Sequence, residues 1–61
     1  MPLVIVKADE GRSIDQKRGL VRDITSAVCK NFSCPPEAVS IMIQEGKKEN
    51  RARAGKLAID S

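Results

Sequence analysis

The order of apolar and polar residues predicts a strand, a long helix and a second strand. Residues 3–8 (LVIVKA) are almost continuously apolar and rich in β-branched side chains, which is typical of a strand buried on at least one face. Residues 39–44 (VSIMIQ) place three β-branched apolar side chains on one face and Ser40, Met42 and Gln44 on the other, which predicts a second strand. Between the strands, apolar residues recur at the three- and four-residue spacing of a helix with one apolar face. They are Leu20, Val21, Ile24, Ala27, Val28 and Phe32.

The predicted helix has a signal at each end. Residues 13–16 have the Ser-x-x-Gln form of a capping box, in which each end side chain accepts a hydrogen bond from the other residue's backbone N–H. We therefore expect the helix to begin at Ile14. It should run to about Phe32 and end before Cys34-Pro35-Pro36, because a proline disfavours helical geometry in the residue before it and cannot continue the helix. Residues 36–38 should then form a short turn.

A strand, a crossover helix and a second strand make a βαβ unit with parallel strands and a right-handed connection. The predicted fold class is therefore α/β, with two parallel strands and one long helix in a single domain over residues 1–61. One helix covers only one face of the sheet, so the other face and the strand edges need further copies of the chain. The tail from Gly46 onward is predicted to be a loop, in which Leu57-Ala58-Ile59 could pair with a neighbour.

Length and composition also indicate a need for partners. A chain of 61 residues buries only about 60% of the surface that it exposes when unfolded. The chain has two cysteines and no histidine, which is too few ligands for a four-ligand zinc site within one chain. Two cysteines are also too few for a disulfide framework. Oligomerisation is then the expected source of further core. With no long apolar run and no secretory signal, we expect a soluble, cytoplasmic protein without a membrane partner.

The net charge of +3 is concentrated in the tail. Between residues 46 and 56, five cationic side chains accompany one carboxylate, a net charge of +4. Such a cluster can meet nucleic acid, a membrane surface or a small acidic molecule, or it can be a solvated loop, the simplest interpretation. Nucleic acid is disfavoured because Phe32 is the only aromatic ring. A membrane helix is disfavoured because Gly46 and Gly55 bracket the cluster, with no large apolar residue between them.

Several short motifs, taken in their order and spacing, resemble a known family. They are Met1-Pro2 directly before a strand, Glu10-Gly11-Arg12-Ser13 with Gln16-Lys17 at the helix start, the VSIMIQE strand, Glu49-Asn50 and Gly55-Lys56-Leu57. Over essentially the whole chain, this pattern resembles the 4-oxalocrotonate tautomerase family, in its short bacterial and archaeal branch. The resemblance implies dimers with a four-stranded sheet backed by two helices. It further implies a homohexamer that is a trimer of such dimers, or a hetero-oligomer.

The resemblance also implies a keto–enol tautomerase that uses no cofactor. In the family, the initiator methionine is removed and the amine of the proline, here Pro2, is the general base. The expected substrate is a small anion, an unsaturated 2-hydroxy acid or dicarboxylate such as 2-hydroxymuconate. An α-amino group has an ordinary pKa of about 8, and an apolar pocket with cationic neighbours lowers it. Arg12 matches the arginine that binds a substrate carboxylate through its planar fork of donors.

Two positions depart from the family pattern. Ser40 stands where well-studied tautomerases carry a second substrate-binding arginine, and its hydroxyl supplies a hydrogen bond but no charge. Arg51 stands where they carry an aromatic residue that lines the pocket. We therefore predict that Arg51 or Arg53 supplies the missing cationic contact with the substrate. Its proximity to the Pro2 amine would replace the aromatic wall in lowering the amine pKa.

Other functions stay open on sequence grounds. The same scaffold and amine serve dehalogenase and hydratase variants of the family. The chain can also be an assembly subunit in which the altered site is catalytically weakened, or Pro2 can simply begin an edge strand, where proline is tolerated. Nucleic-acid binding through residues 47–56 would appear as steeply salt-dependent retention on DNA.

Overall fold

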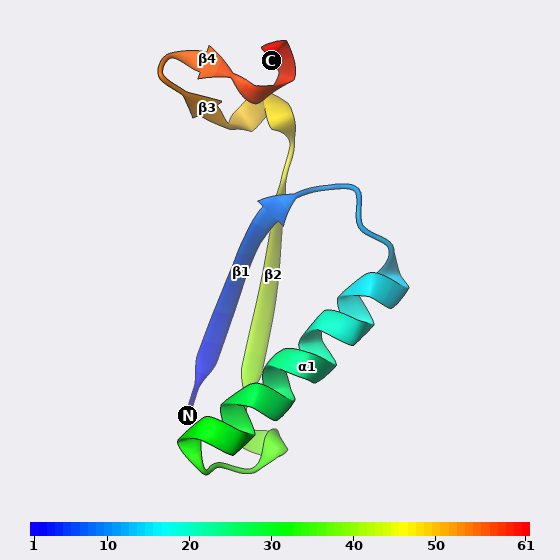
Figure 1. Ribbon diagram of the computed structural model, residues 1–61, viewed down its shortest axis with the longest axis vertical. Coiled ribbons are helices and arrows are strands. Elements are labelled where there is room, and N and C mark those ends of the chain that lie inside the picture. Colours follow the sequence, from blue (N-terminus) through cyan, green and yellow to red (C-terminus); the bar gives the residue numbers. More distant parts are fainter.

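The computed structural model describes residues 1–61 and confirms the βαβ unit (Figure 1). Strand β1 spans Leu3–Asp9, helix α1 spans Ile14–Phe32 and strand β2 spans Ser40–Gly46. The two strands pair in parallel, from Leu3 opposite Ser40 to Asp9 opposite Gly46. The N-terminus lies at one end of this sheet, and the tail extends beyond the other end (Figure 1).

Both ends of α1 follow the predicted signals. The Ser13 hydroxyl accepts a hydrogen bond from the Gln16 N–H at 3.1 Å, and the Gln16 side-chain oxygen accepts one from the Ser13 N–H at 2.8 Å. The helix ends at Ser33, which adopts the left-handed conformation with φ 55°. A 3₁₀ turn over Pro36–Ala38 then leads into β2, as the predicted short turn required.

Both strands extend further at their carboxyl ends than the sequence pattern predicted. β1 continues through Asp9, and β2 begins at Ser40 rather than Val39 and continues to Gly46. Asp9 stays in the sheet because its backbone pairs with Gly46, and the next N–H, that of Glu10, donates to the Gly46 carbonyl at 2.9 Å. Polar side chains do not prevent backbone pairing where they can remain in water.

The tail is not the plain loop that was predicted. Strands β3 (Ala52–Arg53) and β4 (Lys56–Leu57) form an antiparallel hairpin between two 3₁₀ turns. The central residues of the hairpin, Ala54 and Gly55, have φ 53° and 79°, which suits the right-handed twist of the two strands. Leu57 therefore pairs with Ala52 of the same chain, whereas the sequence pattern suggested pairing with a neighbour.

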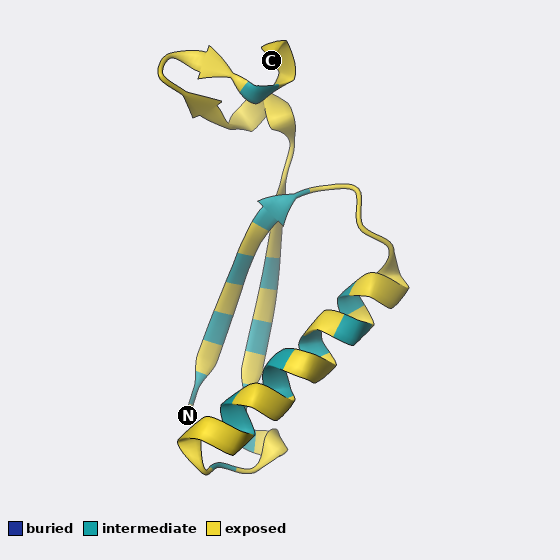
Figure 2. Cartoon of the chain, in the orientation of Figure 1, coloured by how far each residue is buried: buried dark blue, intermediate teal, exposed yellow.

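No residue of the chain is fully buried (Figure 2). The strands alternate half-buried residues, which face α1, with exposed residues on the open face, where Leu3, Ile5 and Met42 are 59%, 49% and 49% exposed. The radius of gyration is 14.8 Å, against about 10.5 Å for a compact chain of this length. One helix on one side of two strands thus leaves the core open. No helix combines the length and the apolar character needed to cross a bilayer.

Candidate active site

The predicted site residues lie at opposite ends of the sheet. Pro2 and Ser40 are neighbours at the amino end, where the Ser40 N–H donates to the Pro2 carbonyl at 3.0 Å. Arg12 and Arg51 lie at the carboxyl end, because both are hydrogen-bonded to Asp9. The seven residues of β1 separate the two ends by about 23 Å at the usual rise of a strand. One chain therefore does not bring Pro2 together with either arginine.

The amino end combines a ring nitrogen, a hydroxyl and an apolar surface. Pro2 is half-buried, whereas Met1 is 96% exposed. Ser40 lies opposite Leu3 in the strand register, so both side chains project from the face that α1 leaves open. With Met1 attached, the Pro2 nitrogen is an amide and has no basicity. Removal of Met1 turns it into a secondary amine at the edge of the open face.

At the carboxyl end, Asp9 binds both arginines. Arg51 donates from Nε and Nη2 to the two carboxylate oxygens of Asp9, at 3.0 and 2.9 Å. Arg12 donates from Nη1 to the Asp9 carbonyl at 2.8 Å. The hydrogen bond from Arg51 lowers the pKa of the Asp9 carboxyl and raises the pKa of the Arg51 guanidinium. The Arg51 side chain is still 54% exposed, so it can meet a further anion.

Arg53 does not contact Asp9, but it shares an open hollow with Arg51. This hollow of about 520 Å³ is lined by four cationic side chains and by no Asp or Glu. The four are Lys48, Arg51, Arg53 and Lys56. An excess of positive charge of this kind favours small anions.

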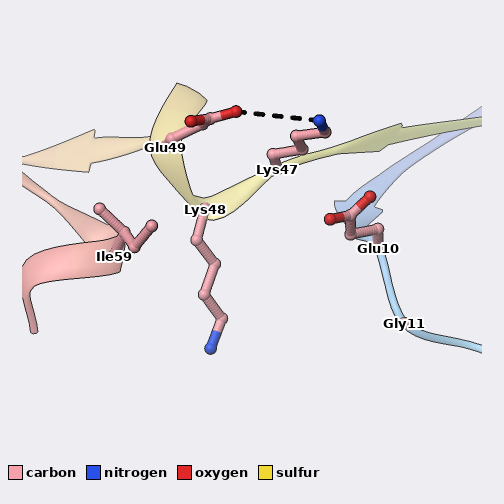
Figure 3. A pocket seen from close by; sticks show the side chains of 6 residues that line it. All are labelled: Glu10, Gly11, Lys47, Lys48, Glu49 and Ile59. Carbon is pink, nitrogen blue, oxygen red and sulfur yellow. Dashed lines mark ion pairs between the residues drawn. The ribbon is translucent and has the colours of Figure 1, made fainter.

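Two other hollows are less suited to an anion. The largest, of about 720 Å³, lies between the end of the sheet and the tail (Figure 3). It is lined by Glu10, Gly11, Lys47, Lys48, Glu49 and Ile59. Its two lysines are matched by two glutamates, one of which pairs with Lys47 at 3.9 Å. A hollow of about 250 Å³ beside Arg12 lies between α1 and the sheet, where Lys17 and Glu45 form an ion pair that holds the helix to β2.

The two cysteines are not among the predicted site residues, and the Cys29 thiol is a poor nucleophile. Cys29 and Cys34 are free, half-buried thiols near the end of α1. Burial, with a further contribution from Cys34, raises the pKa of the Cys29 thiol, so it stays protonated and unreactive near neutral pH. No group of three or more His, Cys, Asp or Glu side chains is arranged to hold a metal ion.

Comparisons with known proteins identify the family of this chain. A family model described as "Tautomerase enzyme" matches residues 2–60. The chain belongs to the tautomerase family. It is 42% identical over 60 residues to the 2-hydroxymuconate tautomerase of Bacillus subtilis, with 98% of this chain and 97% of the relative covered. The predicted family, fold class and tautomerase type of isomerase are therefore confirmed.

Solved structures of this family match the tautomerase closely. The crystal structure of a homologue of 4-oxalocrotonate tautomerase superposes with a TM-score of 0.93 at 40% identity, and 98% of each chain is covered. A heterohexamer 4-oxalocrotonate tautomerase from Chloroflexus aurantiacus superposes with a TM-score of 0.90 at 30% identity, with 98% of this chain and 97% of that chain covered.

Asp9 lies just beyond the first strand as predicted from the sequence, residues 3–8, and no role was predicted for it. The available signal was an acidic residue directly after an apolar strand and directly before the Glu-Gly-Arg-Ser motif. Its partner Arg51 is 42 positions away along the chain, so no local pattern connects the two residues.

Proposed function

We propose that this tautomerase interconverts the enol and keto forms of small unsaturated 2-hydroxy acids, with Pro2 as the general base after removal of Met1. The Pro2 nitrogen takes the proton of the enol hydroxyl, and the electron pair of the O–H bond forms the carbonyl. The carbon–carbon double bonds shift, and the protonated amine returns a proton to the remote carbon. The atoms and electrons balance within the substrate and one shuttled proton, so the step needs no co-reactant.

Two observations together support this proposal: Pro2 lies far from Arg12 and Arg51 within one chain, and one edge of β1 is unpaired. The sheet has two strands, so the edge of β1 that faces away from β2 is unpaired. Two copies that pair along this edge about a twofold axis run antiparallel. Pro2 of one copy then lies beside the Asp9 end of the other copy. A basic amine and two anion-binding arginines would thus meet in a shared site.

Each residue of the proposed site has a distinct role. Arg51 uses two of its five N–H groups on Asp9, so three remain for a substrate carboxylate. Arg12 uses one of its five on the Asp9 carbonyl, so four remain. Of the two candidates for the second cationic contact, Arg51 is better placed than Arg53, because Arg51, like Arg12, is hydrogen-bonded to Asp9. Its positive charge would also disfavour the protonated amine and lower the pKa of Pro2. Ser40, next to Pro2, would donate a hydrogen bond to the substrate.

We further propose that such dimers assemble into a hexamer of this chain, or of this chain with a related one. The Chloroflexus aurantiacus neighbour is described as a heterohexamer. In this chain, the open sheet face with Leu3, Ile5 and Met42 is the apolar surface that further assembly would cover.

Ultraviolet absorbance tests the catalytic role of Pro2. Wild-type protein should ketonise 2-hydroxymuconate or phenylenolpyruvate, and Pro2→Ala should lose most of this activity because a primary amine on a more mobile residue replaces the ring nitrogen. Intact mass must first show that Met1 is absent. Equal activity of the wild type and Pro2→Ala would contradict the proposal and favour a purely structural subunit.

Subunit mixing tests whether the site is shared. Pro2→Ala and Arg51→Ala are each expected to be weakly active. If the two are unfolded together and refolded, half of the randomly formed pairs are mixed, and each mixed pair has one intact site, so about a quarter of wild-type activity should return. The control mixes Pro2→Ala with Arg22→Ala, which removes an exposed arginine of α1 instead of Arg51. No gain of activity on mixing would contradict a site made by two chains.

A further inference from the structure

Asp9 occupies a position where its side chain can act on the open face of the sheet. It is the last residue of β1, and its backbone is held in register opposite Gly46. Side chains alternate along a strand, so Asp9 shares its face with Leu3 and Ile5, the face that α1 does not cover. A hollow of about 320 Å³ lies here, and Asp9 and Arg51 both line it.

Asp9 is the one residue that is hydrogen-bonded to both Arg12 and Arg51. The two bonds from Arg51 to the carboxylate fix the plane of the guanidinium as well as its position. The hydrogen bond from Arg12 to the Asp9 carbonyl holds the Arg12 side chain at the carboxyl end of β1. The side chain and backbone of a single residue therefore direct both cationic groups.

The same carboxylate also holds the tail. Between residues 47–61 and the rest of the chain, the two bonds of Arg51 to Asp9 are the only hydrogen bonds, and this pair is the only ion pair. The hairpin and its cationic hollow thus depend on Asp9 for their direction relative to the sheet.

We infer that Asp9 is a positioning residue of the tautomerase active site, which holds Arg51, and with it the tail, in the orientation that receives a substrate carboxylate. This inference rests on the proposed function, because substrate binding at Arg12 and Arg51 belongs to that proposal. Without the Asp9 carboxylate, Arg51 is a long, exposed side chain that the substrate must order on binding. The consequence is weaker substrate binding with little change in the chemical step at Pro2.

Steady-state kinetics with 2-hydroxymuconate tests this role in the assembled protein. Asp9→Asn keeps the shape of the side chain but removes its charge. It should raise KM about three- to tenfold, the factor that corresponds to ordering one long side chain, with kcat within about twofold of the wild type. Because Asp9 acts through Arg51, Asp9→Asn should have no further effect in the Arg51→Ala background.

Glu10→Gln is the matched control, because it also removes one negative charge, at the residue that follows Asp9. Glu10 takes part in no ion pair. The KM of Glu10→Gln should equal that of the wild type. A wild-type KM in Asp9→Asn, or independent, multiplying effects of Asp9→Asn and Arg51→Ala, would overturn the inference. If Pro2→Ala is inactive while Asp9→Asn has a normal KM, only this inference fails; if Pro2→Ala is fully active, the proposed function itself fails.

A second measurement does not depend on activity or on a variant that assembles. In NMR spectra of the wild-type protein near neutral pH, the Nε–H of Arg51 should exchange with water more slowly than that of Arg22, because only Arg51 donates this hydrogen to a hydrogen-bonded carboxylate. Equal exchange of the two groups would overturn the inference.

Discussion

Replacing Ile5 with lysine tests whether the open face of the sheet is the assembly surface. Ile5 is 49% exposed and lies opposite Met42 on that face. The chain has an accessible surface of 4956 Å², which is about 1,100 Å² more than a compact protein of its mass exposes. Each partner in a standard stable interface contributes about 800 Å². The excess surface is therefore large enough for at least one such interface.

The magnitude of the effect follows from the exposure of Ile5. Complete burial of an isoleucine side chain stabilises by about 1.5–3 kcal/mol, so the half that is still exposed accounts for about 1 kcal/mol per subunit. Lysine loses this contribution and adds several kcal/mol for removing an ammonium group from water. A combined loss of about 4 kcal/mol per subunit weakens association about a thousandfold for each substituted subunit.

Sedimentation velocity and circular dichroism over a dilution series measure this effect. Ile5→Lys should sediment as the edge-paired dimer or a smaller species at concentrations where the wild type forms larger assemblies. It should also lose part of its secondary structure, because no residue of a single chain is fully buried. Ile14→Lys makes the same change at the start of α1, where the side chain is 66% exposed, and should assemble normally. An Ile5→Lys protein that assembles like the wild type, or a wild type that is a stable folded monomer, would refute the reasoning.

Three further predictions concern the capping box, the tail hairpin and the Asp9–Arg51 pair. Ser13→Ala removes the acceptor for the Gln16 N–H and should lower the free energy of unfolding by about 1 kcal/mol; urea denaturation at one protein concentration measures this, and an unchanged midpoint would contradict it. Ala54→Gly should raise the melting temperature slightly, since Ala54 has φ 53° and the left-handed conformation costs a residue with a side chain about 1–2 kcal/mol; a lower melting temperature would show that unfolded-state entropy dominates. The pKa of Asp9 is lowered by Arg51, so the pair stabilises the folded state above the ordinary aspartate pKa of about 3.9, and this stabilisation is lost as pH falls through the lowered pKa. Asp9→Asn should therefore lose less stability than the wild type between neutral and acidic pH in thermal melts, and parallel curves for the two proteins would argue against the pair.

The local elements of this protein could be predicted from the sequence because the interactions that form them are local. The capping box joins residues three positions apart, and the apolar spacing of α1 repeats within one helical turn. The parallel pairing of β1 and β2 followed from the length of the crossover between them. The carboxyl ends of the strands and the hairpin at Ala54 could not be predicted in this way, because backbone pairing decides them more than side-chain pattern does.

The candidate site likewise has features that depend on single residues and features that depend on contacts between distant residues. The sequence by itself determined the chemistry, namely a proline ahead of the first strand, an arginine before the helix cap and an excess of cationic residues in the tail. Only the tertiary structure decided that Pro2 lies about 23 Å, at the rise of a strand, from the arginines, and that Asp9 binds Arg12 and Arg51 together. The physical reason is distance along the chain: a residue's chemical character is its own, whereas an ion pair between residues 42 positions apart depends on the path of everything folded between them.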